Sequence, residues 1–227
     1  MERVLIIAAH PDDEVLGMGG TISKYTSQGI EVNLLIVTDG SSSQYSQRHD
    51  IDSIIAAKKN ETRKCADLLG INKIFYGNLP DMKLDATPHI EINRVIEGVI
   101  DEVKPSIVYT HFSGDVNKDH GCVYESTLVA CRPVQNQCVK KLFSYSVPSS
   151  TEWNIQNENS VFTPNWYEDI SGKHAEIKYN AFSCYETEVR PYPHPRSIEY
   201  LRILDSAEGL KVGLQAAESF ILLRSIT

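Results

Sequence analysis

The stretch VLIIAAHPDDEVLGMGG, residues 4–20, decides the fold of this chain. Its first six residues are apolar, acids and glycines follow them, and helical spacing of apolar residues begins at Val15. This order predicts a buried strand, a loop and a helix. Residues 10–14, with the sequence His-Pro-Asp-Asp-Glu, then lie at the carboxyl end of the strand, which is the edge of an open α/β sheet where ligands bind.

Strands and helices alternate along the rest of the chain. Residues 31–38 are almost continuously apolar, as expected of a strand that is buried on both faces. The alternation predicts an α/β fold, with a three-layer, mostly parallel, Rossmann-like sheet, helices on both faces, right-handed crossovers and a mixed C-terminal portion. Further strands are predicted at 73–76, 107–110, 141–147 and 220–224, and helices at 15–28, 52–69, 92–103, 174–185 and 197–208.

Length and composition predict one domain over residues 1–227. A chain of 227 residues with 41% hydrophobic content is long enough for one well-packed core and short for two. Within it, residues 39–50 form a polar connection with four serines at the sheet edge that carries His10. This connection is either a mobile substrate loop or a plain solvated loop, and the sequence does not decide between them.

A second set of polar residues follows the strand at 107–110. The segment 111–120 holds two histidines, two aspartates and an asparagine. If the strands are parallel, this loop and the loop after the first strand converge at one edge of the sheet. Two histidines, one carboxylate and an open position form the ligand set of a catalytic zinc site. We therefore predict that His10, Asp13 and His120 hold one metal ion per chain.

The other acids of these loops have separate predicted roles. Asp12 is free to act as the general base toward a water molecule whose pKa a metal ion would lower. Asp119 either orients His120 or caps the helix that begins there, and Glu14 supports the ligands or interacts with the helix dipole. The alternative, in which these acids only cap a helix, leaves His10 and the paired aspartates unexplained.

The motif AHPDDE at residues 9–14, its glycine-rich continuation and the Asp-His pair at 119–120 resemble the PIG-L/LmbE-like zinc-dependent N-deacetylases. That family removes acetyl groups from N-acetylglucosamine-type sugars, and the resemblance covers roughly the first 130 residues. It implies the same three zinc ligands and the same base as the spacing does. It also implies substrate-binding roles for Arg63 and Asp81, although a surface arginine and a turn cap remain open as structural alternatives.

The chain departs from the family pattern at Asn117, where many members carry a His three residues before the zinc-binding one. Asn can donate a hydrogen bond to a developing oxyanion, but it cannot supply a proton at neutral pH. We therefore predict His194 as the proton donor, with His111 packed beside the ligands and Arg196 placed to bind an anionic substrate group. The alternatives are that Asp12 carries both proton transfers and that the Pro-His-Pro segment is only a stiff surface turn.

Charge and composition exclude several classes of partner. A net charge of −8 and a pI of about 5.4 argue against nucleic acid or an anionic membrane as the main partner. No apolar stretch approaches the ~20 residues that span a bilayer, and the N-terminal apolar run is too short for a signal peptide. These features predict a cytoplasmic protein, and the five cysteines lack C-x-x-C spacing, which favours reduced thiols.

The sequence thus predicts a hydrolase that removes the N-acetyl group from an N-acetylglucosamine-type sugar or from its nucleotide- or phosphate-linked conjugate. The expected cofactor is Zn²⁺, with Fe²⁺ or another divalent ion as an alternative, and a homo-oligomer is compatible with the sequence. Two other functions stay open. One is a sugar-binding protein that keeps the metal without turnover, and the other is a non-haem iron oxygenase, whose facial triad uses the same ligand set.

Overall fold

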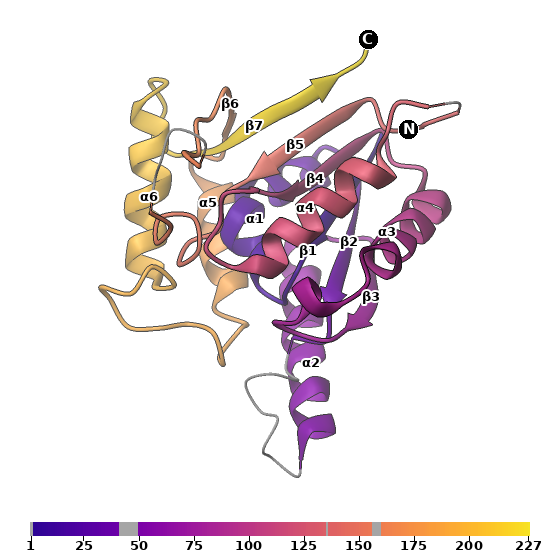
Figure 1. The fold of residues 1–227 in the computed structure, drawn as a ribbon. Helices are drawn as coiled ribbons and strands as arrows, with labels where there is room; N and C mark the ends of the chain where they lie inside the picture. The colour runs from indigo at the N-terminus through magenta and orange to yellow at the C-terminus, as the bar shows by residue number, and fades with distance from the viewer. Residues whose placement is uncertain (1, 41–49, 135, 156–159) are drawn as a thin grey trace.

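The structure is a computed structural model that describes residues 2–40, 50–134, 136–155 and 160–227 (Figure 1). Across these residues, seven strands form one sheet in the order β3-β2-β1-β4-β5-β7-β6. The pairs among β1 to β5 are parallel, whereas β7 is antiparallel to both of its neighbours. The strands are β1 (Arg3–Ala8), β2 (Glu31–Thr38), β3 (Lys73–Leu79), β4 (Ile107–His111), β5 (Lys141–Tyr145), β6 (Trp166–Asp169) and β7 (Ala217–Ser225).

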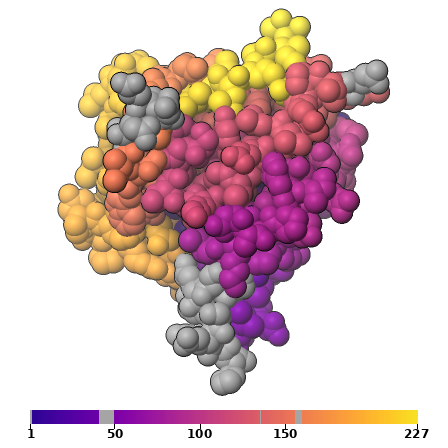
Figure 2. All heavy atoms as spheres, viewed as in Figure 1, coloured from indigo at the N-terminus to yellow at the C-terminus, as the bar shows by residue number. Residues whose placement is uncertain are grey.

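Helices cover both faces of this sheet. Successive residues of β1 point to opposite faces, so Ile6 and Ile7 belong to different hydrophobic cores. Helices α1, α2, α5 and α6 contribute to the core of Ile6, and α3 and α4 to the core of Ile7, the face that their side chains cover in Figure 2. The helical elements are α1 (Asp13–Ser27), α2 (Ile51–Leu69), η1 (Leu84–Ala86), α3 (His89–Val103), α4 (Lys118–Ala130), α5 (Lys173–Phe182) and α6 (Ile198–Leu210).

This architecture confirms the predicted α/β fold, including the mixed C-terminal portion. The predicted strands and helices end within three residues of their observed bounds. The sequence did not predict β6, because it has only four residues and pairs with β7 alone at the sheet edge, where the hydrophobic pattern is weak. Residues 41–49 of the predicted substrate loop lie outside the described residues, and no described helix is long and apolar enough to cross a membrane.

The strand order positions the site. β1 pairs with β2 on one side and with β4 on the other, so the direction of the winding changes between β1 and β4. A crevice opens at such a switch point, outside the carboxyl ends of the two strands. The loops after β1 and β4 meet there, and the backbone N–H of Ala9 donates to Nε2 of His111 at 2.8 Å. The fold therefore brings residues that are about 100 positions apart into contact.

Candidate metal centre and its pocket

The loop after β1 is held in a tight conformation. Asp12 has a positive φ of 107°, which is uncommon for a residue with a side chain, and α1 begins at Asp13. The backbone N–H of His10 donates to Oδ2 of Asp13 at 2.7 Å, which closes the turn. Gly40 packs against Pro11 so closely that a Cβ atom would lie 2.5 Å from the proline ring. These contacts fix His10 and Asp13 on the same side of the loop.

The three predicted ligands come together in the structure. His10, Asp13 and His120 each offer one ligand atom, and these atoms lie within 4.8 Å of one another. Nδ1 of His10 is 3.4 Å from Oδ2 of Asp13, and Nε2 of His120 is 3.5 Å from Oδ1 of the same carboxylate. The Asp13 carboxylate therefore lies between two imidazole rings, as expected for a two-histidine, one-carboxylate metal site.

Two further aspartates orient the rings. Nδ1 of His120 is 2.7 Å from Oδ2 of Asp115, which leaves its Nε2 for an ion. Nε2 of His10 is 3.1 Å from Oδ2 of Asp119, so its Nδ1 is the nitrogen that faces Asp13. Asp119 thus contacts His10 and fills neither of its two predicted roles, because His120 is oriented by Asp115 and the N-cap of α4 is Asn117. Carboxylates in this position raise the basicity of a histidine ligand.

The carboxylates around His10 and His120 favour positive charge on these two rings. Although burial lowers it, the Asp119 and Asp13 carboxylates raise the pKa of His10 well above its usual value. Burial also lowers the pKa of His120, but the Asp13 and Asp115 carboxylates outweigh it and raise this pKa to about 9. A partly buried and a buried ring that attract a proton in an acidic cluster are suited to exchange that charge for a divalent cation.

His111 lies inside the protein behind the ligands. Its ring stacks on His120 with the ring centres 3.9 Å apart, and its Nε2 is 3.3 Å from Oδ2 of Asp13. Burial and the charge of His120 lower the pKa of His111 to about 4. His111 therefore packs against the predicted ligand His120, and it is not among the residues that line the pocket.

A cavity of about 220 Å³ opens over the three ligands. Asp12 lies in its wall and is almost completely buried. Burial and the nearby Glu188 carboxylate raise the pKa of Asp12 well above its usual value, which suits a group that must take up a proton. The other lining residues that were predicted are Asp81, Asn117 and Arg196.

Glu14 and Asp81 support this cavity from the inside. Glu14 is fully buried, where its carboxylate accepts hydrogen bonds from the Tyr185 hydroxyl at 2.6 Å and from the backbone N–H of Asp12 at 3.2 Å. Glu14 therefore fixes the loop conformation of Asp12. Oδ1 of Asp81 lies 3.3 Å from Nε2 of His10, so Asp81 lies beside a predicted ligand as well as in the cavity wall.

A chain of ion pairs reaches the predicted base. Nζ of Lys58 is 2.5 Å from one Glu188 oxygen, and Nη1 of Arg196 is 2.6 Å from the other. The same Arg196 nitrogen is 3.6 Å from Oδ2 of Asp12. Arg196 is therefore paired with two acids of its own chain at the site, and Glu188 pairs with two cations in the lining of the cavity.

Two predicted residues are not among those that line the cavity. Arg63 is exposed on α2, and its charge acts on Tyr76 of β3. His194 packs edge-on against the Trp153 ring, with ring centres 5.3 Å apart, and its Nδ1 accepts the backbone N–H of Arg196 at 3.0 Å. Asn117 does line the cavity, but its Oδ1 caps α4 by accepting the N–H of Asp119 at 3.0 Å.

The sequence reasoning missed four residues of the site: Asp115, Lys58, Glu188 and Trp153. Asp115 lies in the segment that we singled out, and the need of His120 for an acceptor on its second nitrogen could have identified it. Lys58 and Glu188 are 130 positions apart and carry no local signal of their pairing. Trp153 follows a proline-serine loop, and no periodic pattern distinguishes it from a surface aromatic residue.

Comparison with known proteins assigns the chain to a family. Residues 5–131 match the PIG-L family, described as GlcNAc-PI de-N-acetylase. The chain belongs to this family. The match contains most of β1, all of β2 to β4 and the three predicted ligands. Of the two cations that pair with Glu188, it includes Lys58 and not Arg196.

Relatives of this PIG-L protein include named deacetylases. Diacetylchitobiose deacetylase of Thermococcus kodakarensis is 29% identical over 225 residues, which cover 96% of this chain and 82% of the relative. The protein YaiS of Escherichia coli, described as an uncharacterized deacetylase, is 27% identical over 192 residues, which cover 81% of this chain and 90% of YaiS. The N,N'-diacetylchitobiose deacetylase structure from Pyrococcus horikoshii shares the fold, with a TM-score of 0.76 and 23% identity over 98% of this chain and 84% of that one.

Proposed function

We propose that this PIG-L protein is a zinc-dependent hydrolase that removes the acetyl group from an N-acetylglucosamine-type sugar. One observation carries the proposal: the three ligand residues and the buried base Asp12 line one cavity at the switch point of the sheet. The diacetylchitobiose deacetylases among its relatives support an acetylated sugar as the substrate class. The proposal takes the ligands and the base as the sequence predicts them.

The residues present fit a divalent cation. The donors are two imidazoles and one carboxylate, and the second nitrogen of each imidazole is already held by an aspartate. The coordinating nitrogens would be Nδ1 of His10 and Nε2 of His120, with Asp13 as the third ligand. When bound, the ion lowers the pKa of water and polarises the amide carbonyl.

The side chains of this protein then carry the proton transfers. Asp12 accepts the proton of the attacking water molecule, and its raised pKa allows it to keep that proton until the amine leaves. His194 packs on Trp153 outside the lining of the cavity, so we propose that Asp12 also returns the proton to the leaving amine. The Asn117 amide, which lines the cavity, would donate a hydrogen bond to the developing oxyanion.

Acetate release tests this function. The protein is stripped with a chelator, Zn²⁺ or Fe²⁺ is returned, and release is measured from a panel of N-acetylated mono- and disaccharides. Asp12→Asn should lower release by about 10²- to 10⁴-fold and keep the metal, because the amide preserves the shape but accepts no proton. His120→Ala should lose the metal, and Asp85→Asn, an exposed acid on η1, should change neither property.

Other outcomes would replace the proposal. Metal-loaded protein that binds the sugars without releasing acetate would be a binding protein that has lost turnover. Iron-dependent oxygen consumption would indicate an oxygenase. If Asp12→Asn releases acetate within a fewfold of the parent rate, Asp12 is not the base, and if His120→Ala keeps its full metal content, the ligand assignment is wrong.

A further inference from the structure

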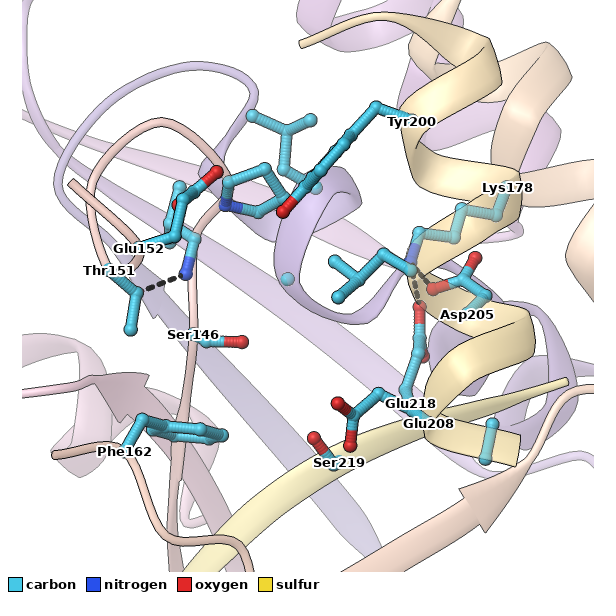
Figure 3. Close-up of a pocket in the computed structure, with 16 residues that line it drawn as sticks. Ser146, Thr151, Glu152, Phe162, Lys178, Tyr200, Asp205, Glu208, Glu218 and Ser219 are labelled. Carbon is cyan, nitrogen blue, oxygen red and sulfur yellow. Dashed lines mark hydrogen bonds and ion pairs between the residues drawn. The ribbon is translucent and has the colours of Figure 1, made fainter. Parts of the chain in front are cut away.

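A second cavity lies next to the metal pocket. It has a volume of about 210 Å³, and Figure 3 shows the side chains that line it. The two cavities share Leu16, Val147 and Pro148 as a common wall. Most of the second cavity is built from residues 146–219, which follow the segment that matches the family. The cavity therefore lies largely outside the segment that the family model matches.

A buried ion cluster forms one side of this cavity. Nζ of Lys178 is 2.8 Å from Asp205 and 2.9 Å from Glu218, and all three side chains are at most 2% exposed. Glu218 also accepts the backbone N–H groups of Gly20 and Thr21 at 3.0 and 2.7 Å. Lys178 is thus fully engaged by two acids, and the cluster is held rigidly between α5, α6, β7 and α1.

The rest of the lining supplies acceptors and two aromatic rings. Glu208 pairs with Lys211 through Oε1, while its Oε2 is buried and has no hydrogen-bond partner among the described residues. Tyr200 is hydrogen-bonded to Glu152. Burial, together with the charge of Glu152 and this hydrogen bond, raises the pKa of Tyr200 to about 12. Figure 3 shows Tyr200, Ser146, Glu208 and Ser219 directing oxygen atoms toward the same space, with Phe162 at its edge.

The charges of the lining select the ligand. Four carboxylates, those of Glu152, Asp205, Glu208 and Glu218, face one lysine in this cavity. When Lys211, which pairs with Glu208, is also counted, the four carboxyl groups still outnumber the two lysines. Such a cavity repels phosphate and carboxylate and attracts a cation that can also use hydroxyl groups.

We propose that this cavity binds an amino sugar through its ammonium group. The ammonium would donate to the free Oε2 of Glu208, the ring hydroxyls would bond with the serine and tyrosine hydroxyls, and the apolar face of the ring would lie against the aromatic side chains. This inference rests on the proposed deacetylation, because that reaction converts a neutral acetamido group into an ammonium group. The ligand is either a deacetylated unit of the same substrate or the free product.

Binding to a protein that cannot turn over tests the cavity separately from the reaction. In the His120→Ala background, calorimetry should show that glucosamine binds at least about tenfold more tightly than N-acetylglucosamine or glucosamine 6-phosphate. Glu208→Gln should weaken glucosamine binding about tenfold, since a charge-assisted hydrogen bond is lost. Tyr200→Phe provides a second variant that keeps the ring, and Glu199→Gln, an exposed acid on the same helix α6, is the matched control.

The outcomes separate this inference from the proposed function. Equal affinity for the three sugars, or glucosamine binding that is insensitive to both Glu208→Gln and Tyr200→Phe, overturns the cavity assignment even if acetate release is observed. Charge-selective binding without any acetate release would leave the cavity standing and remove the deacetylase. In the active protein, a disaccharide with one free amine that competes with glucosamine identifies a unit of the substrate as the ligand. Glucosamine binding that this disaccharide does not displace identifies the free product.

Discussion

Asp115→Asn tests whether the partners of the ligands set the metal affinity. The Asp115 side chain is completely buried, where one oxygen faces Nδ1 of His120 at 2.7 Å and the other accepts the Thr151 hydroxyl at 2.5 Å. Asparagine has nearly the same shape and can still accept from one of these groups. The substitution therefore removes the negative charge and one acceptor but leaves no cavity.

The size of the effect follows from this geometry. A carboxylate that orients a histidine ligand typically contributes about 10- to 100-fold to metal affinity, or about 1.4–2.7 kcal/mol. Both contacts of Asp115 are short, and water is excluded from them. We therefore expect the upper half of this range, with Zn²⁺ binding weakened by about 30- to 100-fold.

Competition with a chelator of known affinity measures the zinc dissociation constant of each variant. Asp119→Asn, which alters the partner of His10, should weaken binding in the same way. Asp85→Asn is the control, because this exposed acid pairs only with the exposed Lys118 among the described contacts. If Asp115→Asn and Asp85→Asn have equal zinc affinity while both keep the folded circular dichroism spectrum, the carboxylate does not support the ligand.

Three further predictions concern the pocket and the core. Trp153 lines the pocket with 54% of its surface exposed, so Trp153→Ala should raise KM more than it lowers kcat. In a Trp166→Phe protein, Trp153 is the sole tryptophan, and added sugar should quench its fluorescence. His194→Ala should keep kcat within a fewfold, and a loss above about 10²-fold would restore it as the proton donor. Burial raises the pKa of the Cys65 and Cys131 thiols, the latter to about 12, so both should resist alkylation at pH 8 until the protein unfolds.

Sequence periodicity predicted the parts of the fold that depend on local burial. The apolar runs at β1 and β2 are buried on both faces, and their observed bounds differ little from the predicted ones. The meeting of His10, Asp13 and His120 was also predictable, because strand-end loops of neighbouring parallel strands converge at one edge of the sheet. These features follow from the order of elements, and that order is visible in the hydrophobic pattern.

The partners of the ligands were not predictable in the same way. Asp115 and Asp119 both precede His120, but Asp115 lies in the loop and Asp119 in the first turn of α4, and the sequence does not show which ring each one contacts. Lys58 and Glu188 meet because α2 and the segment after α5 pack together, which no local pattern records. Hydrophobic periodicity does not show the direction of side chains at helix ends, and it does not show which residues pair across 130 positions.

The ion pairs also bear on the predicted role of Arg196. Its guanidinium lies 2.6 Å from Glu188 and 3.6 Å from Asp12, so an anionic substrate group would have to compete with two carboxylates of the protein. Displacing Arg196 would leave Glu188 paired with Lys58 alone in a buried position, which is unfavourable. A neutral sugar avoids this competition, and the acidic second cavity beside it disfavours the same anions. The charges of both cavities therefore favour an uncharged or amine-bearing conjugate over the nucleotide- or phosphate-linked sugar that the sequence also permitted.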